Sequence, residues 1–372
     1  MHLKHSQSRL DFAVRLVLAF LCLVLFGIEN SMSAAVSADA WTSTSSNLWG
    51  TAGNWNNGVP TTNSQITFTD NTGIQHSITL SAASIANKIT FANGTGSSGF
   101  VFDTAGSTSI LTISSSGGIT NNDSSTQVFN NIVTNSASQT WNAASGGLTF
   151  DAINLGQTLI LTGSHAFIFG NNGGTLTLTS NRTLTNNASG SVTIGAIDLS
   201  NSTTNRTLTV NGSGTTTVTG VIDNGAGSAG KLTYSGTGSL ILSGANTYAG
   251  VTTISSGTVT ANNNSALGTG TVTLGGGTLN STASNTLANN ITLTANSNIN
   301  DITIAGALTL TGNRTLGLDG ATLAGAVNLS NSGTTRTLTV NTGAGNTGTI
   351  NGVIGNGSAS SGKIKKIGDG DL

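Results

Sequence analysis

From about residue 66 onward, the chain consists of short runs in which apolar and polar residues alternate, separated by clusters of glycine, asparagine and serine. Alternation with a period of two is typical of β-strands with one buried face, and the Gly/Asn/Ser clusters are typical of turns. No charged linker or long helical pattern interrupts the runs, which include SITL, KITF, TLILT and TLTLT. The pattern predicts an all-β protein without a second domain.

Equivalent runs recur at a nearly fixed interval. Two series of apolar residues, spaced 19–20 and 18–19 residues apart, are Leu240, Val259, Leu279 and Ile299, and Ile254, Val272 and Ile291. Intervals of this length are typical of solenoid repeats. Two interleaved series predict one coil per repeat with at least two strands, each stacked in parallel on its equivalent in the next coil, with the apolar side chains inside. We therefore predict a parallel β-helix, or β-solenoid, with coils of about 19–20 residues.

The stretch from Gly238 to Asn280 resembles the autotransporter-associated β-strand repeat. That repeat follows the pattern G-x-L-x-L-x-G-x-N-x-Y-x-G-x-T-x-[IV]-x-x-G-x-[LV], and then a step of a small residue, Leu and Gly. The repeat signature in this chain is Leu240, Leu242, Gly244, Asn246, Tyr248, Gly250, Thr252, Ile254, Gly257 and Val259, followed by Ala266, Leu267 and Gly268. The resemblance implies a right-handed β-helical passenger region of a large secreted or surface-displayed bacterial protein. It implies no catalytic motif.

Residues 1–40 have the features of a secretory signal peptide with a helical apolar core. A basic start is followed by the unbroken apolar run Leu16–Ile28 and then by small residues, which predict cleavage between about residues 35 and 40. The candidate cleavage tripeptides are Val36-Ser37-Ala38 and Ala38-Asp39-Ala40. The alternative is a membrane anchor, but the run is shorter than the roughly 18–20 residues that span a bilayer. The one cysteine, Cys22, lies in this run, so the mature chain would have no thiol.

Residues 41–68 contain three of the four tryptophans, Trp41, Trp49 and Trp55. The first coil of a solenoid exposes unpaired backbone groups, and bulky aromatic residues could cover them. We predict that this segment is an N-terminal cap and that residues 69–372 are the β-helix repeats. The alternative for the tryptophans is an exposed aromatic platform for sugar rings.

A longer repeat is superimposed on the short one. The segment LTLTSNRTL at 176–184 returns as LTLTGNRTL at 308–316, an offset of 132 residues that predicts about seven coils of 19 residues. In this alignment the second copy stops at Leu372, within a unit. We therefore expect the chain to be a fragment of a longer protein that continues the repeat.

Composition offers little catalytic chemistry. Charged residues are 7% of the chain, against about 25% in ordinary soluble domains. The net charge of −1 and the absence of long Lys/Arg clusters argue against a nucleic-acid partner. The only glutamate, Glu29, precedes the expected cleavage, and His76 and His165 are far apart in sequence. We predict no catalytic, cofactor-binding or metal-binding residue, and no enzymatic activity.

Two sets of charged residues have a spacing that could bring them together. Asp103 and Asp123, like Asp301 and Asp319, are about one coil apart, but aspartate also favours turns, which we take as the explanation. The four arginines that precede Thr-Leu are Arg182, Arg206, Arg314 and Arg336. We expect them to point to solvent and to protect sheet edges from further strand addition, and a ligand-binding pair is the alternative.

The functional prediction is a non-catalytic, secreted or cell-surface β-helical passenger that acts as a structural stalk or an adhesin-like module. The alternative is a carbohydrate-binding or carbohydrate-active β-helix. The sequence identifies no partner; surface glycans and other cells are the candidates. A membrane would be contacted only through a C-terminal segment beyond Leu372.

Overall fold

The structure is a computed structural model that describes residues 37–104, 109–201, 203–329, 334–356 and 361–372. The expected signal-peptide helix therefore lies outside the described residues, apart from its last four positions. Residues Ser37–Leu372 form one compact unit. Within the described residues, the helical structure is a single 3₁₀ turn, η1 (Ala52–Asn54), and no helix is long and apolar enough to cross a membrane.

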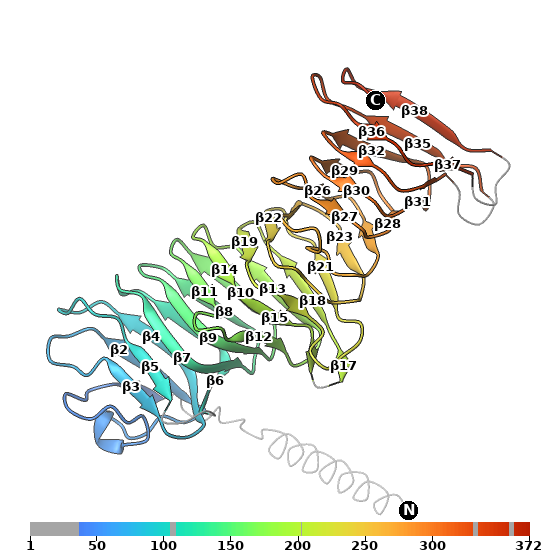
Figure 1. Ribbon diagram of the computed structural model, residues 1–372. Helices are drawn as coiled ribbons and strands as arrows, with labels where there is room; N and C mark the ends of the chain where they lie inside the picture. Colours follow the sequence, from blue (N-terminus) through green and yellow to red (C-terminus); the bar gives the residue numbers. More distant parts are fainter. Residues whose placement is uncertain (1–36, 105–108, 202, 330–333, 357–360) are drawn as a thin grey trace, which may run out of the picture. The chain divides into compact units, whose positions relative to one another are not determined.

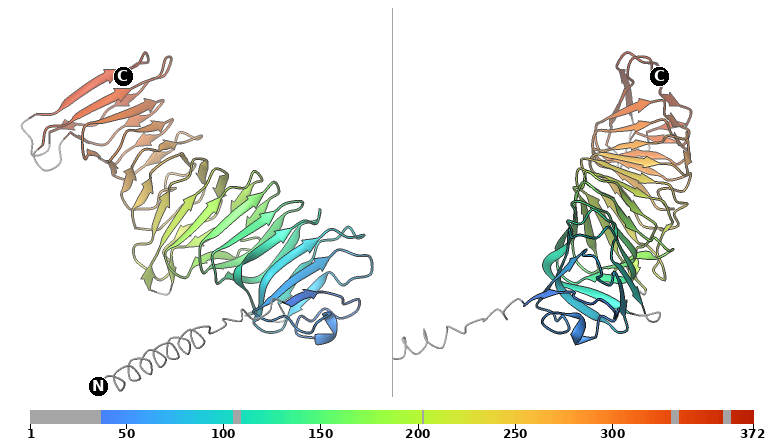
Figure 2. Two further views of the ribbon diagram at one scale, coloured as in Figure 1. Left: turned by 180° about the vertical axis from the view of Figure 1, so that it is seen from behind. Right: turned by 90° about the vertical axis from the view of Figure 1, so that its left-hand side faces the viewer.

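The strands form a parallel β-solenoid of about 14 turns, as the sequence predicts. Strands of successive coils lie side by side along the unit, in the same order in both views (Figures 1 and 2). Each full coil passes over three faces, here called A, B and C. Three faces per coil exceed the minimum of two that the sequence predicts.

Each face is a stack of parallel strands, and four long strands bend round a corner and so belong to two faces. These four are β4 (Ser84–Ala92), β6 (Ile110–Asn121), β7 (Gln127–Asn135) and β9 (Leu148–Leu155). Face A contains β4 and β6 together with β1 (Ser37–Ala40), β2 (Ser64–Thr69), β8 (Gln139–Ala143), β10 (Leu159–Gly163), β13 (Arg182–Asn186), β18 (Thr207–Asn211), β21 (Lys231–Tyr234), β23 (Thr252–Ile254), β25 (Val272–Leu274), β28 (Ile291–Leu293), β31 (Leu308–Leu310), β34 (Val327–Asn328) and β37 (Ile354–Gly355).

Faces B and C are built in the same way. Face B contains β7 and β9 together with β3 (Ser77–Leu80), β5 (Val101–Thr104), β11 (Phe167–Phe169), β14 (Val192–Ile194), β19 (Thr215–Val218), β22 (Ser239–Leu242), β24 (Thr258–Ala261), β26 (Thr278–Asn280), β29 (Ser297–Asn300), β32 (Arg314–Asp319), β35 (Thr337–Asn341) and β38 (Lys363–Ile367). Face C contains the first parts of β4 and β6 and the second parts of β7 and β9, then β12 (Thr175–Leu178), β15 (Ala196–Asp198), β20 (Ile222–Asp223), β27 (Thr286–Leu287), β30 (Thr303–Ile304), β33 (Thr322–Leu323) and β36 (Thr349–Ile350). An antiparallel hairpin, β16 (Ser200–Asn201) and β17 (Thr204–Asn205), projects between faces C and A.

The register confirms the first predicted series and corrects the second. Leu240 pairs with Val259, Val259 with Leu279, and Leu279 with Ile299, in one column of face B. On face A, Val272 pairs with Ile291 as predicted, but Ile254 pairs with Leu274, two residues beyond the predicted Val272. A slip of two residues keeps the same side chains pointing inward, so the hydrophobic pattern does not distinguish the two registers.

Coil length is less uniform than predicted. The paired residues are 30, 20 and 17 positions apart in sequence for Ile89–Ile119, Ile254–Leu274 and Ile291–Leu308. A period of 19–20 residues therefore holds for the coils between Leu232 and Leu293 and not throughout the solenoid. The extra residues of the longer coils lie in corners and loops, where length is tolerated because the stacked strands are unaffected.

The long repeat does not return to the same face. The first copy of LTLT-x-NRTL runs from β12 on face C to β13 on face A, whereas the second runs from β31 on face A to β32 on face B. The offset therefore corresponds to six coils and one further face, and the prediction of seven coils is wrong. One sequence can thus form the corner between either pair of faces.

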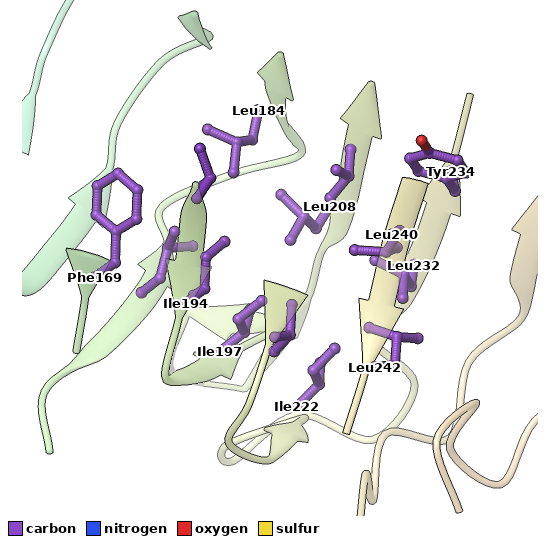
Figure 3. Packing of buried hydrophobic residues seen from close by; sticks show 14 of the residues in the cluster. Phe169, Leu184, Ile194, Ile197, Leu208, Ile222, Leu232, Tyr234, Leu240 and Leu242 are labelled. Carbon is purple, nitrogen blue, oxygen red and sulfur yellow. The ribbon is translucent and has the colours of Figure 1, made fainter. Parts of the chain in front are cut away.

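The interior is a continuous column of apolar side chains (Figure 3). Inward apolar residues alternate with outward threonines in many strands, as in β12, where Leu176 and Leu178 are buried. Near the N-terminal end, a phenylalanine ladder on face B joins successive coils. Its ring centroids are 4.5, 4.8 and 5.4 Å apart for Phe102–Phe129, Phe129–Phe150 and Phe150–Phe169.

The three N-terminal tryptophans are buried at the start of this column. The exposed fractions of Trp41, Trp49 and Trp55 are 4%, 2% and 4%. Trp55 lies edge-on to the other two, at centroid distances of 5.0 and 4.9 Å, and packs on Phe68 of the first coils. Rings packed in this way cover the apolar end of the solenoid and present no open face on which a sugar could stack.

Candidate functional site

The repeat signature occupies one coil and the beginning of the next. Leu240 and Leu242 lie on β22, Thr252 and Ile254 on β23, and Val259 on β24. Between β22 and β23 the chain crosses face C without forming a strand, and this crossing contains Gly244, Asn246, Tyr248 and Gly250. Leu267 and Gly268 occupy the equivalent crossing one coil later. The signature therefore marks the part of face C, between β20 and β27, that has no strand.

At the crossing without a strand, the Asn246 side chain makes the hydrogen bonds to the coil before and the coil after that backbone groups would make in a strand. Its side chain is 2% exposed; Oδ1 accepts a hydrogen bond from the Ile222 amide of the coil before (2.7 Å), and Nδ2 donates to the Ala266 carbonyl of the coil after (2.5 Å). Buried backbone donors and acceptors need such partners, because an unmet one costs about 1–3 kcal/mol. One asparagine thus joins three successive coils.

Tyr248 fills the interior beneath the same crossing. Its ring is fully buried, its Oη lies 2.6 Å from Thr252 Oγ1, and the Thr252 hydroxyl donates to the Leu267 carbonyl at 3.3 Å. Burial raises the pKa of the Tyr248 phenol, and the hydrogen bond with Thr252 opposes part of that rise. The hydroxyl is enclosed in the coil-to-coil contact and cannot serve as a catalytic acid exposed to a substrate.

The signature glycines permit close approach between coils. A Cβ at Gly244 would lie 2.0 Å from the Gly220 carbonyl oxygen, and a Cβ at Gly250 would lie 2.3 Å from that of Gly230. Gly268 also has a φ of +65°, in the left-handed region that favours glycine. Each position requires glycine for packing, and none of them lines a ligand cavity in the described structure.

The carboxylates of Asp103, Asp123 and Asp319, which the spacing singled out, are hydrogen-bond acceptors for neighbouring groups, and Asp301 and Asp319 are joined through their backbones, the Asp301 amide donating to the Asp319 carbonyl at 2.9 Å. Asp103 accepts a hydrogen bond from Asn130 Nδ2 at 2.8 Å, whereas Asp123 is buried beside Gln127 and accepts from the Ser125 amide. Asp319 accepts from the Gly343 amide at 2.7 Å. Aspartates that accept backbone N–H groups at turns follow the turn explanation. Among the described residues, no group of three or more His, Cys, Asp or Glu side chains could hold a metal ion.

Sequence spacing missed one contact between ionisable groups. His76 Nε2 lies 2.6 Å from Oδ1 of Asp70, which is 1% exposed and also accepts from the Ser98 amide. The His76 ring packs on Phe100 with a centroid distance of 4.7 Å. Asp70 and His76 are six positions apart in sequence and lie on either side of one turn. Their closeness in sequence is the only signal that could have suggested this contact. His165, in contrast, is exposed, as expected for a solvent-facing histidine.

The four arginines do not protect sheet edges, which corrects the expectation. Each lies at or just before a strand that is already paired on both sides: β13 lies between β10 and β18, and β32 lies between β29 and β35. Arg182 folds back over its corner, where Nη1 donates to the Asn181 carbonyl and Nη2 to Thr179 Oγ1. All four side chains are half-buried.

The Asn246→Ala variant tests the structural role of the signature. Loss of the side chain leaves the Ile222 N–H and the Ala266 C=O buried without partners, so we expect the free energy of unfolding to fall by about 2–4 kcal/mol. The control is Asn296→Ala: Asn296 is exposed and caps one amide, that of Thr315, so water can replace it at a cost of about 1 kcal/mol or less. Urea denaturation of both variants gives the comparison, and equal losses would contradict the role assigned to Asn246.

The tyrosines provide a test by pH. The chain has two, and burial raises the pKa of Tyr234 to about 12 and that of Tyr248 further. Above pH 10 the unfolded chain loses phenolic protons that the folded chain keeps, so stability should decrease as the pH rises from 10 towards 12. Ultraviolet titration of tyrosinate should show no ionisation near pH 10 in the folded protein and full ionisation there in denaturant. A folded-state signal near pH 10 would mean that one ring is open to solvent.

One protein-family model matches part of this region. Residues 232–261 match the model of the passenger-associated-transport-repeat, and they span β21 to β24 with the strandless crossing between them. No curated protein and no solved structure matches the chain. The matched repeat covers 30 of the 372 residues, and together with the β-solenoid around it fits a repeat protein of the autotransporter-passenger type.

Proposed function

We propose that this protein is a non-catalytic passenger that serves as a structural stalk or adhesin-like module outside the cell. The observation that supports this most strongly is the use of the repeat signature: Asn246, Tyr248 and the glycines all make coil-to-coil contacts. A sequence motif devoted to stacking builds a scaffold of defined register, and solenoids use such scaffolds to present extended surfaces.

The arrangement of acids supports a non-catalytic role. Glycoside hydrolysis uses two carboxyl groups facing one substrate position, about 5–10 Å apart. In the described solenoid the aspartates accept hydrogen bonds from their own turns or from the next coil, as Asp151 does from the Asn172 and Gly174 amides and Asp198 from the Ser200 amide. Carboxylates used in this way are structural acceptors.

The repeat family suggests a secreted or surface location. We further propose that residues 1–35 are the signal peptide, and that the solenoid is right-handed, because parallel β connections within one sheet are almost always right-handed. A crystal structure phased by experiment would report the hand directly, and a left-handed coil would contradict the proposal.

The turnover prediction addresses catalysis directly. The purified protein, incubated with neutral and acidic polysaccharides, should release no new reducing ends and no unsaturated products above a heat-denatured control. The His76→Ala variant is the matched test, because His76 Nε2 lies 2.6 Å from Asp70 Oδ1 and this is the histidine–carboxylate contact found among the described residues. Turnover by the wild type that this variant loses would make the protein an enzyme and end the scaffold proposal.

The cleavage prediction follows from β1. Ser37–Ala40 pair residue by residue with Ser64–Thr67, so cleavage at either tripeptide identified above would remove part or all of this strand. The sequence Ser33-Ala34-Ala35 offers a small-x-small site just before it. N-terminal sequencing of the protein exported by a bacterial host should therefore begin at Val36. A first residue at or beyond Asp39, or an uncleaved product, would contradict this assignment.

A further inference from the structure

Positive charge on the solenoid is concentrated in two rows. Nine of the twelve Lys and Arg residues follow residue 36, and eight of these nine begin, immediately precede or lie within strands in two short series. The first row is Arg182, Arg206 and Lys231, at the starts of β13, β18 and β21. The second begins with Arg314, Arg336 and Lys363, at the starts of β32, β35 and β38, and includes Lys365 and Lys366 within β38.

The first row has one cation in each of three consecutive coils of face A. Arg182 pairs with Leu208, two positions after Arg206, and Lys231 pairs with Thr207, one position after Arg206. The three residues therefore lie near one corner on adjacent strands, which are about 4.8 Å apart, and are staggered by one or two positions along the strands. Like charges at this spacing repel each other. Burial, and then the charge of Arg206, lower the pKa of the Arg182 guanidinium.

No acid in the described structure compensates for this repulsion. Among the described residues, the contact at salt-bridge distance between a basic and an acidic side chain is His76–Asp70, in a different part of the chain. The Nε atoms of Arg182 and Arg206 are both buried without a hydrogen-bond partner among the described residues. Stacked, partly desolvated cations cost free energy, and an anion bound from outside would offset that cost.

A polar cavity of about 340 Å³ lies beside the first row, lined by Asn181, Asn205, Arg206, Thr207, Ala229 and Lys231. Asn181 Oδ1 accepts from the Thr207 amide, and Asn205 Oδ1 accepts from the Ser228 and Ala229 amides. Asn205 Nδ2 donates one hydrogen to Ser228 Oγ at 3.4 Å. Its second hydrogen and the Nδ2 group of Asn181 are the asparagine donors that can face a ligand, since both side chains are exposed.

We propose that the first row is a binding site for an acidic polysaccharide that lies along the corner of the solenoid. Cations in successive coils match a polymer that carries an acidic group on successive sugars, and the asparagine amides and Thr207 match its hydroxyl groups. Nucleic acid fits less well, because single strands are held by exposed aromatic side chains, and Tyr234, the aromatic residue of β21, is 2% exposed. This inference does not depend on whether the protein serves as a stalk.

Calorimetric titration with polygalacturonate at low ionic strength tests the proposal, and uncharged dextran is the comparison polymer. The wild type should bind polygalacturonate and not dextran. The single variant Lys231→Gln, which alters an exposed side chain, should weaken binding at this row about 2–5-fold. The variant Arg182→Gln/Arg206→Gln/Lys231→Gln should reduce the number of binding sites, and further substitution of Arg314, Arg336 and Lys363 by Gln should weaken binding at least about tenfold.

Matched controls separate recognition from folding. Lys88→Gln removes one positive charge from β4, away from either row, and should bind like the wild type. Arg206→Lys keeps the charge and should retain most of the affinity, while circular dichroism reports whether each variant is folded. The proposal is overturned if the first-row triple variant binds polygalacturonate with unchanged affinity and site number. It is also overturned if single-stranded DNA binds as tightly as polygalacturonate, since the row would then be a general polyanion site.

Discussion

Parallel stacking of the backbone from coil to coil is the constraint on which the rest of this structure depends. Each strand satisfies its N–H and C=O groups on the strands above and below, so every corner must return the chain to the same register. Asparagine side chains complete the corners: Asn181, Asn264 and Asn296 each accept an amide from the next coil. Glycines allow adjacent coils to approach closely at positions where a Cβ atom would collide with a backbone carbonyl of the neighbouring coil.

Because register is fixed only along the faces, the length between strands is free to change. Coils of 17 to 30 residues stack in one unit, and the longer ones add loops such as the β16–β17 hairpin. The same freedom explains how one sequence can occupy two different corners. In both copies of the long repeat, an asparagine before the arginine caps a threonine amide one coil later: Asn181 with Thr207, and Asn313 with Thr337. The corner therefore depends on local bonding, whichever faces it joins.

The sequence predicts those features that have a period. The Leu240 column follows from alternation and spacing, and the buried tryptophans follow from their place before the first coil. Three features have no periodic signal. The Ile254 register is ambiguous because a two-residue slip preserves the inward pattern. The strandless crossing depends on which backbone groups Asn246 reaches, and the His76–Asp70 contact depends on the path of one turn. These three features depend on three-dimensional packing, and the spacing of residues in the sequence gives no information about that packing.

Inward residues stabilise the stack and outward corner residues face the solvent, and this difference affects how such a passenger could acquire a binding function. Inward residues and the signature are constrained, because a change at Asn246 or Gly244 affects adjacent coils together. Outward corner residues that make no bond to the next coil meet no such requirement, and equivalent corner positions recur at each coil. A charged residue type that recurs near one corner forms a row, as with Arg182 and Arg206 on adjacent strands, and a row is a surface suited to an extended polymer. Recognition by this fold is therefore expected to involve rows of exposed corner residues, whereas enclosed pockets would interrupt the stack.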